Sequence, residues 1–177
     1  MSLPERLVSL GATGAILGAA TLLGGNLESN GKPELHPYSD IGGVKTWCYG
    51  ETVGTPKPSY TVQECDAQLV KSVRRYWTGI KQYVPEQTPT SVKEAMVSVA
   101  YNVGVSGWAW NRKGVPSPFV QALKAHQWQA ACDAITAPWH GKEGVSLGYK
   151  ATVQGWPSTG LENRRAKEYK VCIRDLQ

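Results

Sequence analysis

The stretch that decides the fold is residues 26–52, NLESNGKPELHPYSDIGGVKTWCYGET, which follows a long uncharged run and is itself polar. Pro33 and Pro37 keep the chain extended, and the glycine pair at 42–43 offers a turn. The segment that follows, VKTWCY at 44–49, is rich in strand-forming residues. The sequence therefore predicts a small antiparallel sheet or hairpin over residues 35–52.

The rest of the chain has helical patterns. The capping box Thr61-x-x-Glu64 precedes apolar residues at helical spacing and predicts a helix over 62–81. A second such box, Ser91-x-x-Glu94, opens an apolar central helix that ends near Gly104. Shorter helices are expected at 117–125, 127–136 and 161–174, separated by Gly/Trp-rich loops at 104–116 and 137–160. The fold class is α+β, a small sheet followed by mostly helix.

The N-terminal segment carries no charge from Leu7 to Leu27. As one helix it would be roughly 30 Å long, about the thickness of a bilayer core. Gly14 and Gly18 form a small-xxx-small pair, and the many glycines make the segment less apolar than an ordinary anchor. A cleaved signal peptide, an uncleaved weak membrane helix and a soluble core helix are all compatible with it. We favour the weak membrane helix, so the expected organisation is an apolar helix over 1–25 and a catalytic domain over 26–177.

Length and composition restrict the classes of function. A chain of 177 residues can form one compact unit or two small lobes. Seven tryptophans and eight tyrosines are typical of surfaces that bind polar ligands such as sugars. The formal charge of +5 favours polyanions, including bacterial cell-wall polymers, and no long basic run indicates nucleic acid.

Four cysteines suggest disulfides. Neither a C-x-x-C pair nor a histidine at ligand spacing accompanies Cys48, Cys65, Cys132 or Cys172, so we expect no metal site. Pairing neighbours in sequence gives Cys48–Cys65 and Cys132–Cys172. Three connectivities are possible in principle, and four reduced cysteines are the alternative.

The polar stretch also contains the residue types that glycoside hydrolysis needs. One carboxylic acid must protonate the leaving oxygen, and a second carboxylate must activate water or stabilise the transition state. Glu28 and Asp40 satisfy this requirement, and Thr46 could hydrogen-bond the water. Carboxylates near turns are more often solvated or capping groups, so spacing alone leaves both interpretations open.

The run Leu35-x-Pro37-Tyr38-x-Asp40-x-x-Gly43-x-x-Thr46-x-x-Tyr49-Gly50-x-Thr52 resembles the active-site signature of the phage-type lysozymes, glycoside hydrolase family 24. Two further motifs resemble the family's central and C-terminal helices: Tyr101-Asn102-x-Gly104 and Gly160-Leu161-x-Asn163-Arg164-Arg165-x-x-Glu168-x-x-x-Cys172. The resemblance covers residues 26–177. The apolar N-terminus resembles the signal-arrest-release segment of a subgroup of endolysins, which are tethered to the inner membrane and later released.

This resemblance implies a lysozyme-like fold and a muramidase that acts on peptidoglycan in the host periplasm during phage lysis. It implies no metal or other cofactor, no nucleic-acid partner, and contact with the inner membrane through the N-terminal helix before release; we expect a monomer. Glu28 would be the general acid, Asp40 the carboxylate that positions water, and Thr46 its partner. Arg164 matches an arginine that pairs with the catalytic glutamate, while Asn102, Tyr38 and Trp108 are candidates for binding substrate or supporting the site.

One spacing departs from the family pattern, because the eleven residues between Glu28 and Asp40 exceed the usual separation. Glu34 is therefore a rival, but it lies in the expected strand, where we expect it to be too close to face Asp40 across a sugar ring. Trp108 could stack on a sugar or belong to the core. His36 is more simply explained as an incidental neighbour of the prolines. Two other functions stay open, a lytic transglycosylase and a non-enzymatic membrane or cell-wall-binding protein.

Overall fold

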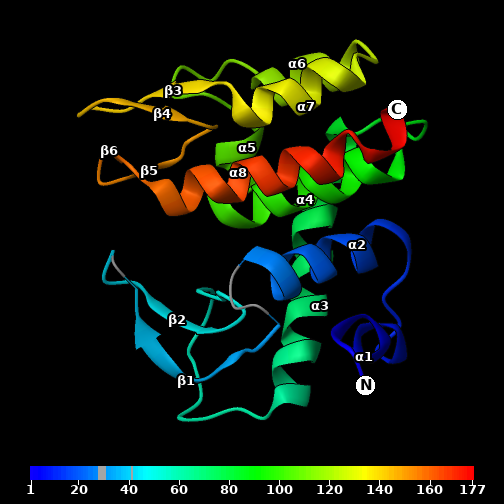
Figure 1. The fold of residues 1–177 in the computed structure, drawn as a ribbon, viewed down its shortest axis with the longest axis vertical. Coiled ribbons are helices and arrows are strands. Elements are labelled where there is room, and N and C mark those ends of the chain that lie inside the picture. Colours follow the sequence, from blue (N-terminus) through cyan, green and yellow to red (C-terminus); the bar gives the residue numbers. More distant parts are fainter. Residues whose placement is uncertain (28–30, 41) are drawn as a thin grey trace. The chain divides into compact units, whose positions relative to one another are not determined.

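The computed structural model of the chain describes residues 1–27, 31–40 and 42–177. They divide into two compact units, residues 1–75 and 76–177, and the colours of Figure 1 follow the chain from one unit to the other. Each unit is described by itself below. The helical majority and the small antiparallel sheets confirm the predicted α+β class.

The N-terminal segment of the first unit is not the single apolar helix that the sequence predicts. It forms helix α1 (Leu3–Ser9), helix α2 (Gly14–Leu22) and one π-helical turn (Leu23–Leu27). The break comes at Gly11, whose φ of 78° is the left-handed conformation that ends a helix, and whose amide donates to the Val8 carbonyl at 2.8 Å. Among the described residues, none of the helices is long and apolar enough to cross a membrane.

This segment is packed into the first unit. Leu7, Ala19, Ala20 and Leu23 have no exposed surface. A Cβ added to Gly24 would lie 2.9 Å from Leu3 Cδ2 and 3.0 Å from Leu69 Cδ2, so the backbone approaches these side chains as closely as it can.

An ion pair joins α1 to α3 (Val62–Ile80). Arg6 Nε lies 2.6 Å from Asp66 Oδ2, and the Tyr49 hydroxyl donates to Asp66 Oδ1 at 2.8 Å. Asp66 is 1% exposed, so the pair is shielded from solvent on one side. The hydrogen bond that Arg6 donates to Asp66 raises the pKa of Arg6.

The sheet of the first unit is a hairpin, as expected. Strand β1 (Glu34–Ser39) pairs antiparallel with β2 (Lys45–Cys48), and Tyr38 lies opposite Thr46. Helix α3 starts with the predicted capping box, because the Thr61 amide donates to Glu64 and the Glu64 amide donates to the Thr61 hydroxyl. The disulfide Cys48–Cys65 joins β2 to α3, which is the expected pairing.

A buried carboxylate fixes the segment that follows β2. Glu51 is 2% exposed and accepts hydrogen bonds from the amides of Thr52 and Val53 and from side chains on α3, namely Gln68, Ser72 and Arg75. Burial alone would raise the pKa of Glu51, but these hydrogen bonds outweigh it and hold the pKa below its usual value. The network therefore stabilises the folded chain at neutral pH, and its contribution is lost as the pH falls through the lowered pKa.

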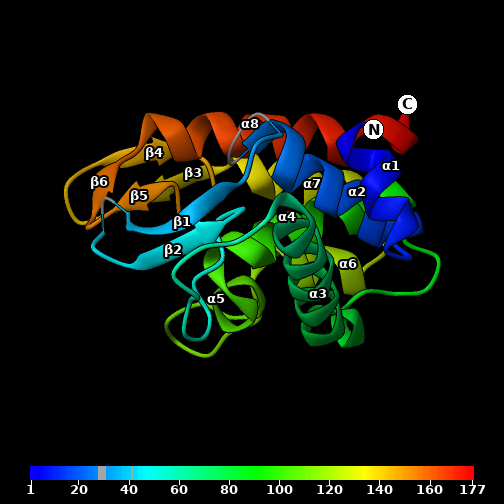
Figure 2. The same ribbon diagram turned by 90° about the horizontal axis from the view of Figure 1, so that it is seen from below.

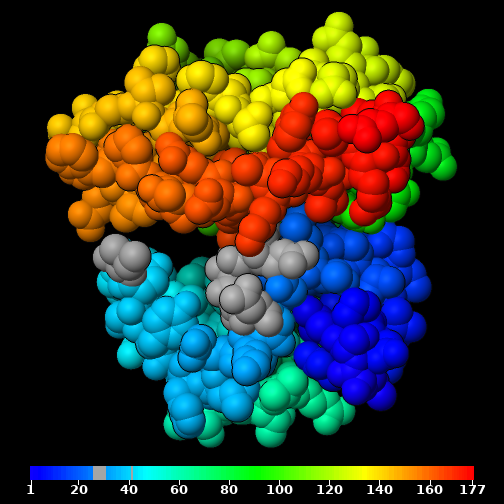
Figure 3. All heavy atoms as spheres, in the orientation of Figure 1, coloured from blue at the N-terminus to red at the C-terminus, as the bar shows by residue number. Residues whose placement is uncertain are grey.

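The second unit contains most of the helices. They are α4 (Thr90–Val103), α5 (Val105–Ala109), α6 (Pro118–Lys124), α7 (Trp128–Thr136) and α8 (Thr159–Cys172), with short 3-10 turns at Lys81–Tyr83 and Arg174–Leu176. Helix α8 runs beside α4, and both views agree on this arrangement (Figures 1 and 2). The outer side of α8 lies at the surface of the unit (Figure 3), whereas Arg164, Arg165, Glu168 and Cys172 are buried.

Two predictions about this unit are wrong. Helix α4 begins at Thr90 and not at a Ser91 cap; the Ser91 hydroxyl instead donates to the Cys172 carbonyl, and Glu94 pairs with Arg174. The expected loops are also partly ordered. The first contains α5, and the second forms two small hairpins, β3 (Pro138–His140) with β4 (Val145–Leu147) and β5 (Thr152–Val153) with β6 (Trp156–Pro157).

The core of the second unit combines a disulfide with stacked rings. Cys132–Cys172 joins α7 to α8, again the expected pairing. Trp108 stacks on Phe119 at 5.9 Å between centroids, and Tyr149 meets Phe119 edge-on at 4.6 Å. The Tyr149 hydroxyl donates to the Gly107 carbonyl at 2.8 Å, so this aromatic group ties the β-hairpin segment to α5.

Gly24 offers a test of how tightly the N-terminal segment packs. We expect Gly24→Ala to destabilise the folded protein by about 1–3 kcal/mol, because its methyl group would overlap the side chains of Leu3 and Leu69. Gly25→Ala is the matched control, since its Cβ would approach nothing closer than 3.9 Å. Urea denaturation measures both. Equal midpoints for the two variants would contradict the packing.

Candidate active site

The centre of the candidate site is the turn between β1 and β2. The Asp40 amide donates to the Val44 carbonyl at 2.9 Å, and the Val44 amide donates back to Asp40 Oδ1 at 2.8 Å. Gly43 has a φ of 77°, a conformation that favours glycine. The Asp40 side chain is thus held by its own turn through one oxygen while the residue stays exposed.

The Thr46 side chain is hydrogen-bonded to the carbonyl of Val44 as well. Its hydroxyl donates to the Val44 carbonyl at 3.0 Å, and the residue is 4% exposed. The carbonyl of Val44 therefore accepts from both the Asp40 amide and the Thr46 hydroxyl. A hydroxyl that donates its hydrogen in this way can still accept hydrogen bonds through its oxygen.

The glutamates on either side of this turn differ in what the structure says of them. Glu28 lies outside the described residues. Glu34 is the first residue of β1 and is six positions from Asp40. At about 3.3 Å per residue that separation is roughly 20 Å, well beyond the distance at which two carboxyl groups can serve one sugar ring. On this strand spacing Glu34 is too far from Asp40, whereas the sequence suggested that it would be too close.

Two other residues from the polar stretch lie on the same strand. Tyr38 is 42% exposed and lies directly opposite Thr46 in the register, so the two side chains project from the same face of the hairpin. Tyr38 thus lies next to the Asp40 turn. The other residue, His36, has its Nδ1 atom 3.3 Å from the Pro58 carbonyl, which gives this ring a local partner.

In the second unit, α8 carries a buried ionic network. Glu168 accepts from Arg164 Nε at 3.2 Å, from Arg165 Nη1 at 2.6 Å and from the Ser98 hydroxyl at 2.6 Å. Arg165 also donates to the Tyr149 carbonyl and to Asn102 Oδ1, and Arg164 donates to the Ser98 carbonyl. Burial lowers the pKa of Arg165 from its usual value.

The carboxylate of Glu168 is shared between two arginines. The guanidinium groups of Arg164 and Arg165 both contact it, and all three residues are at most 6% exposed. Arg164 forms a further interaction beyond those given above.

The structure also shows where the candidate aromatic residue, Trp108, lies. Trp108 has no exposed surface and is packed against Phe119 and Tyr83, so it cannot stack on a sugar. The prediction that it contacts substrate is wrong, and the core alternative holds. Asn102 is exposed at the end of α4, and its carbonyl oxygen is held by Arg165.

Sequence reasoning gave no role to the buried carboxylates that accept hydrogen bonds within each unit. Glu51 and Asp66 are such acceptors in the first unit, and Glu168, which the C-terminal motif contains, is one in the second. A signal existed only for Glu168, because its spacing from Arg165 and Arg164 is the i,i+3 and i,i+4 spacing of helical ion pairs. The partners of Glu51 and Asp66 are distant in sequence, so local patterns could not identify them.

Comparison with known proteins identifies the family of the chain. The family model for phage lysozyme matches residues 29–168. A SAR-endolysin of Bacteriophage PS119 is 29% identical over 164 residues, which is 90% of this chain and 87% of the relative. A SAR-endolysin of Enterobacteria phage P21 is 28% identical over 165 residues, 90% of this chain and 88% of the relative.

A solved structure shares the fold. The active form of the P1 phage endolysin Lyz superposes with a TM-score of 0.76 at 23% identity, over 100% of this chain and 96% of that chain. Because the family model matches most of the chain, including the turn that carries Asp40 and Thr46, this protein belongs to the phage lysozyme family and is a glycoside hydrolase of the lysozyme type.

Proposed function

We propose that the protein is a phage endolysin that lyses the host by hydrolysing the β-1,4 linkage between N-acetylmuramic acid and N-acetylglucosamine in peptidoglycan, with Glu28, Asp40 and Thr46 as its catalytic residues. Membership of the phage lysozyme family supports the reaction and the substrate. The observation that carries the residue assignment is the carbonyl of Val44, to which the Asp40 amide and the Thr46 hydroxyl both donate.

This arrangement suits the binding of a nucleophilic water. The water would donate one hydrogen to the Asp40 carboxylate and the other to the oxygen of Thr46, whose own hydrogen is directed at Val44. Both hydrogens of the water are then engaged, and a lone pair of its oxygen can face the sugar. As the oxygen attacks the anomeric carbon, Asp40 accepts the proton as general base.

Glu28 would complete the reaction on the other side of the sugar. It protonates the glycosidic oxygen as the bond to N-acetylglucosamine breaks, so that Glu28 ends ionised and Asp40 ends protonated. A proton returned through solvent restores the starting state. Direct attack by water opposite the leaving group inverts the configuration at the anomeric carbon.

Arg164 is proposed to pair with Glu28, as the resemblance to the family implies. Such a pairing would orient the acid. Tyr38, beside Thr46 on the hairpin, and Asn102 are proposed as supporting or substrate-binding residues.

The two alternatives make different demands on these residues. A lytic transglycosylase needs the acid but does without a positioned water, so Asp40 and Thr46 would have no task. A non-enzymatic membrane or wall-binding protein needs none of the three. The shared Val44 acceptor favours the hydrolase over both.

Amide substitutions test the residue assignment. We expect Glu28→Gln and Asp40→Asn each to lower the rate of reducing-end release from purified peptidoglycan by at least about 100-fold, because each removes a proton-transfer group. Glu34→Gln is the matched control and should keep nearly full activity. Full activity in Glu28→Gln together with loss in Glu34→Gln would reverse the assignment of the acid.

We further propose that residues 1–25 act as a signal-arrest-release segment that exports the chain, tethers it to the inner membrane and later leaves the bilayer. The name SAR-endolysin of the relatives supports this step. The same apolar residues would serve both states, since Leu7, Ala19, Ala20 and Leu23 are buried in the folded first unit. Glu28 lies three positions beyond residue 25, so a tethered chain would hold its acid at the membrane surface.

Substitution of Gly14 tests this step. Gly14 has a φ of 51°, so Gly14→Leu would strain the folded segment and also make it more apolar in the bilayer. Combined with Gly18→Leu, it should delay or prevent lysis of cells that produce the protein. Gly14→Asn is the control, because Asn tolerates this backbone conformation and adds no apolar surface. Unchanged lysis timing in the double leucine variant would count against tethering.

A further inference from the structure

Two neighbouring hollows lie on the first unit where α1 packs beside α3 (Figure 1), and they share Leu10 as a wall. The first has a volume of about 240 Å³ and is lined by Leu10, Ala67, Val70, Lys71 and Arg74. The second has a volume of about 360 Å³, and its lining includes Met1, Arg6, Ser9, Val62 and Asp66. We call the two together the α1–α3 groove. None of these residues has a task in the proposed catalytic reaction.

The surface that the groove offers to a ligand is largely apolar. Leu10 is half-buried and Val62 is 41% exposed. The polar groups of the second hollow are already paired within the protein, because Arg6 lies 2.6 Å from Asp66 and the Ser9 hydroxyl donates to the Arg6 carbonyl at 2.7 Å. Neighbouring apolar side chains that stay exposed in a folded protein mark a binding surface more often than scattered ones do.

Two cations, Lys71 and Arg74, lie at one end of this apolar surface. They are three positions apart on α3 and therefore share a face of the helix. Arg74 Nη2 donates to the Gly11 carbonyl at 2.8 Å, which holds the guanidinium beside the end of α1 and leaves its other N–H groups for a ligand.

These cations have no acidic partner. Among the residues that the structure describes, neither Lys71 nor Arg74 forms a salt bridge, and the lining of the first hollow contains neither Asp nor Glu. Two like charges held together without a carboxylate favour an anionic ligand. Because an apolar surface adjoins them, the ligand that suits the groove is an amphiphile with a negatively charged head.

The length of the groove fits one acyl chain. Arg74 lies at its charged end and Val62 at its apolar end, and along α3 they are separated by roughly 18 Å at about 1.5 Å per residue. One leaflet of a bilayer core, half of roughly 30 Å, is about 15 Å thick. A chain that starts at the cations can therefore extend over Leu10 to Val62.

We propose that the α1–α3 groove binds an anionic phospholipid of a membrane surface, with the phosphate against Lys71 and Arg74 and an acyl chain over Leu10. A cell-wall polyanion would use the two cations but not the apolar surface, so the lipid fits the groove better. Binding of this kind keeps the folded protein at the membrane surface after its N-terminal segment has folded. The inference goes beyond the proposed function and does not require that the protein cleaves glycan.

Sedimentation with vesicles at about 0.15 M salt tests the proposal. We expect the purified full chain to bind vesicles of equal parts phosphatidylglycerol and phosphatidylcholine at least about tenfold more tightly than vesicles of phosphatidylcholine alone. Lys71→Gln/Arg74→Gln should lower binding to the phosphatidylglycerol vesicles at least about tenfold, because it removes both cations. Equal binding to the two kinds of vesicle would indicate insertion of the apolar N-terminal segment and would overturn the proposal.

A second variant guards against a loss of folding. Ala67→Glu places a carboxylate on an exposed part of the groove and keeps the hydrogen bond between Arg74 and Gly11. It should also weaken binding to the phosphatidylglycerol vesicles, because the new charge repels the phosphate. Unchanged binding by folded Ala67→Glu would contradict the groove as the site.

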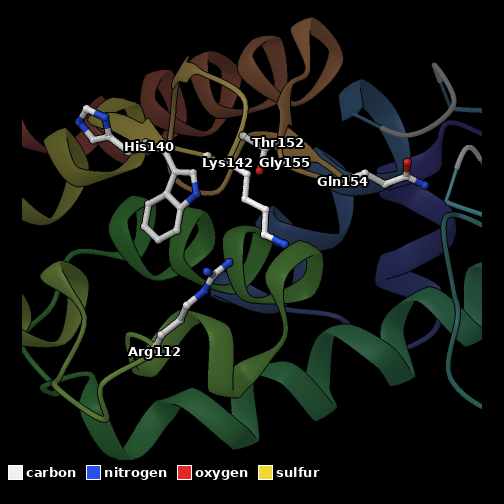
Figure 4. Close-up of a pocket in the computed structure, with 8 residues that line it drawn as sticks. Arg112, His140, Lys142, Thr152, Gln154 and Gly155 are labelled. Carbon is white, nitrogen blue, oxygen red and sulfur yellow. The ribbon is translucent and has the colours of Figure 1, made fainter.

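A pair of cations in the second unit provides the matched control. Arg112 and Lys142 line a separate pocket with Thr152 and Gln154, and the ends of both basic side chains point into the same space (Figure 4). Arg112→Gln/Lys142→Gln removes the same charge as the groove variant and should bind phosphatidylglycerol vesicles nearly as tightly as the wild type. An equal loss in the two double variants would mean attraction by net charge alone, and the groove would have no special role.

A soluble lipid locates the site. Dihexanoyl phosphatidylglycerol, below the concentration at which it forms micelles, should shift the methyl NMR signals of Leu10 and Val62 and leave those of Ile135, which is buried in the second unit, unchanged. Glycerol phosphate has no acyl chains and should need at least about a tenfold higher concentration for the same shifts. Equal affinity would identify an adventitious ion only, and unshifted Leu10 and Val62 signals would place the lipid elsewhere; either result refutes the proposal while leaving the proposed reaction untouched.

Discussion

The carbonyl oxygen of Val44 accepts two hydrogen bonds, one from the Asp40 amide and one from the Thr46 hydroxyl, and the proposed chemistry depends on this shared acceptor. It holds the turn closed, directs the hydroxyl hydrogen of Thr46 inward and leaves the Thr46 oxygen able to accept from a water. The Cys48–Cys65 disulfide joins this hairpin to α3, and the buried carboxylate of Glu51 accepts hydrogen bonds from side chains of the same helix. Rigid surroundings of this kind keep a water-binding pair aligned without a metal ligand in the proposed mechanism.

The N-terminal segment connects folding to the proposed control of activity. Its residues are apolar enough to have predicted a membrane helix, yet in this structure they form two short helices that bury Leu7 and Leu23 and are anchored by Arg6 on Asp66. A moderately apolar, glycine-rich segment can be buried either in a bilayer or in the folded protein. A bilayer stabilises it less than it would stabilise a strongly apolar helix, so the segment is not committed to the membrane. Position 28 directly follows this segment, so its folding and the placement of the proposed acid are coupled by the chain itself.

The sequence predicted those parts of the fold that depend on local patterns. The hairpin, the capping box at Thr61 and the end of α4 at Gly104 all follow from short-range chemistry. The pairing of each cysteine with its neighbour in sequence was one of three possible connectivities, and the structure contains it. The predictions failed where contacts between residues distant in sequence determine the structure. Ser91 is hydrogen-bonded to the C-terminal helix instead of capping its own helix, and Trp108 packs against rings from other elements. The apolar N-terminal run is broken at Gly11. For the site, the resemblance gave Asp40 and Thr46, but only the structure revealed that both donate to the Val44 carbonyl.

The configuration of the first product tests the central claim most directly, because a water held by Asp40 and Thr46 can attack only opposite the leaving group. Hydrolysis of purified peptidoglycan, followed by NMR before the new reducing ends mutarotate, should show that the muramic acid ends are released first as the α-anomer, and in ¹⁸O-labelled water they should carry the label. Release of the β-anomer would mean a covalent intermediate in place of a positioned water. An anhydro-muramyl end without label would mean a transglycosylase, and either result would contradict the role assigned to the Asp40–Thr46 pair.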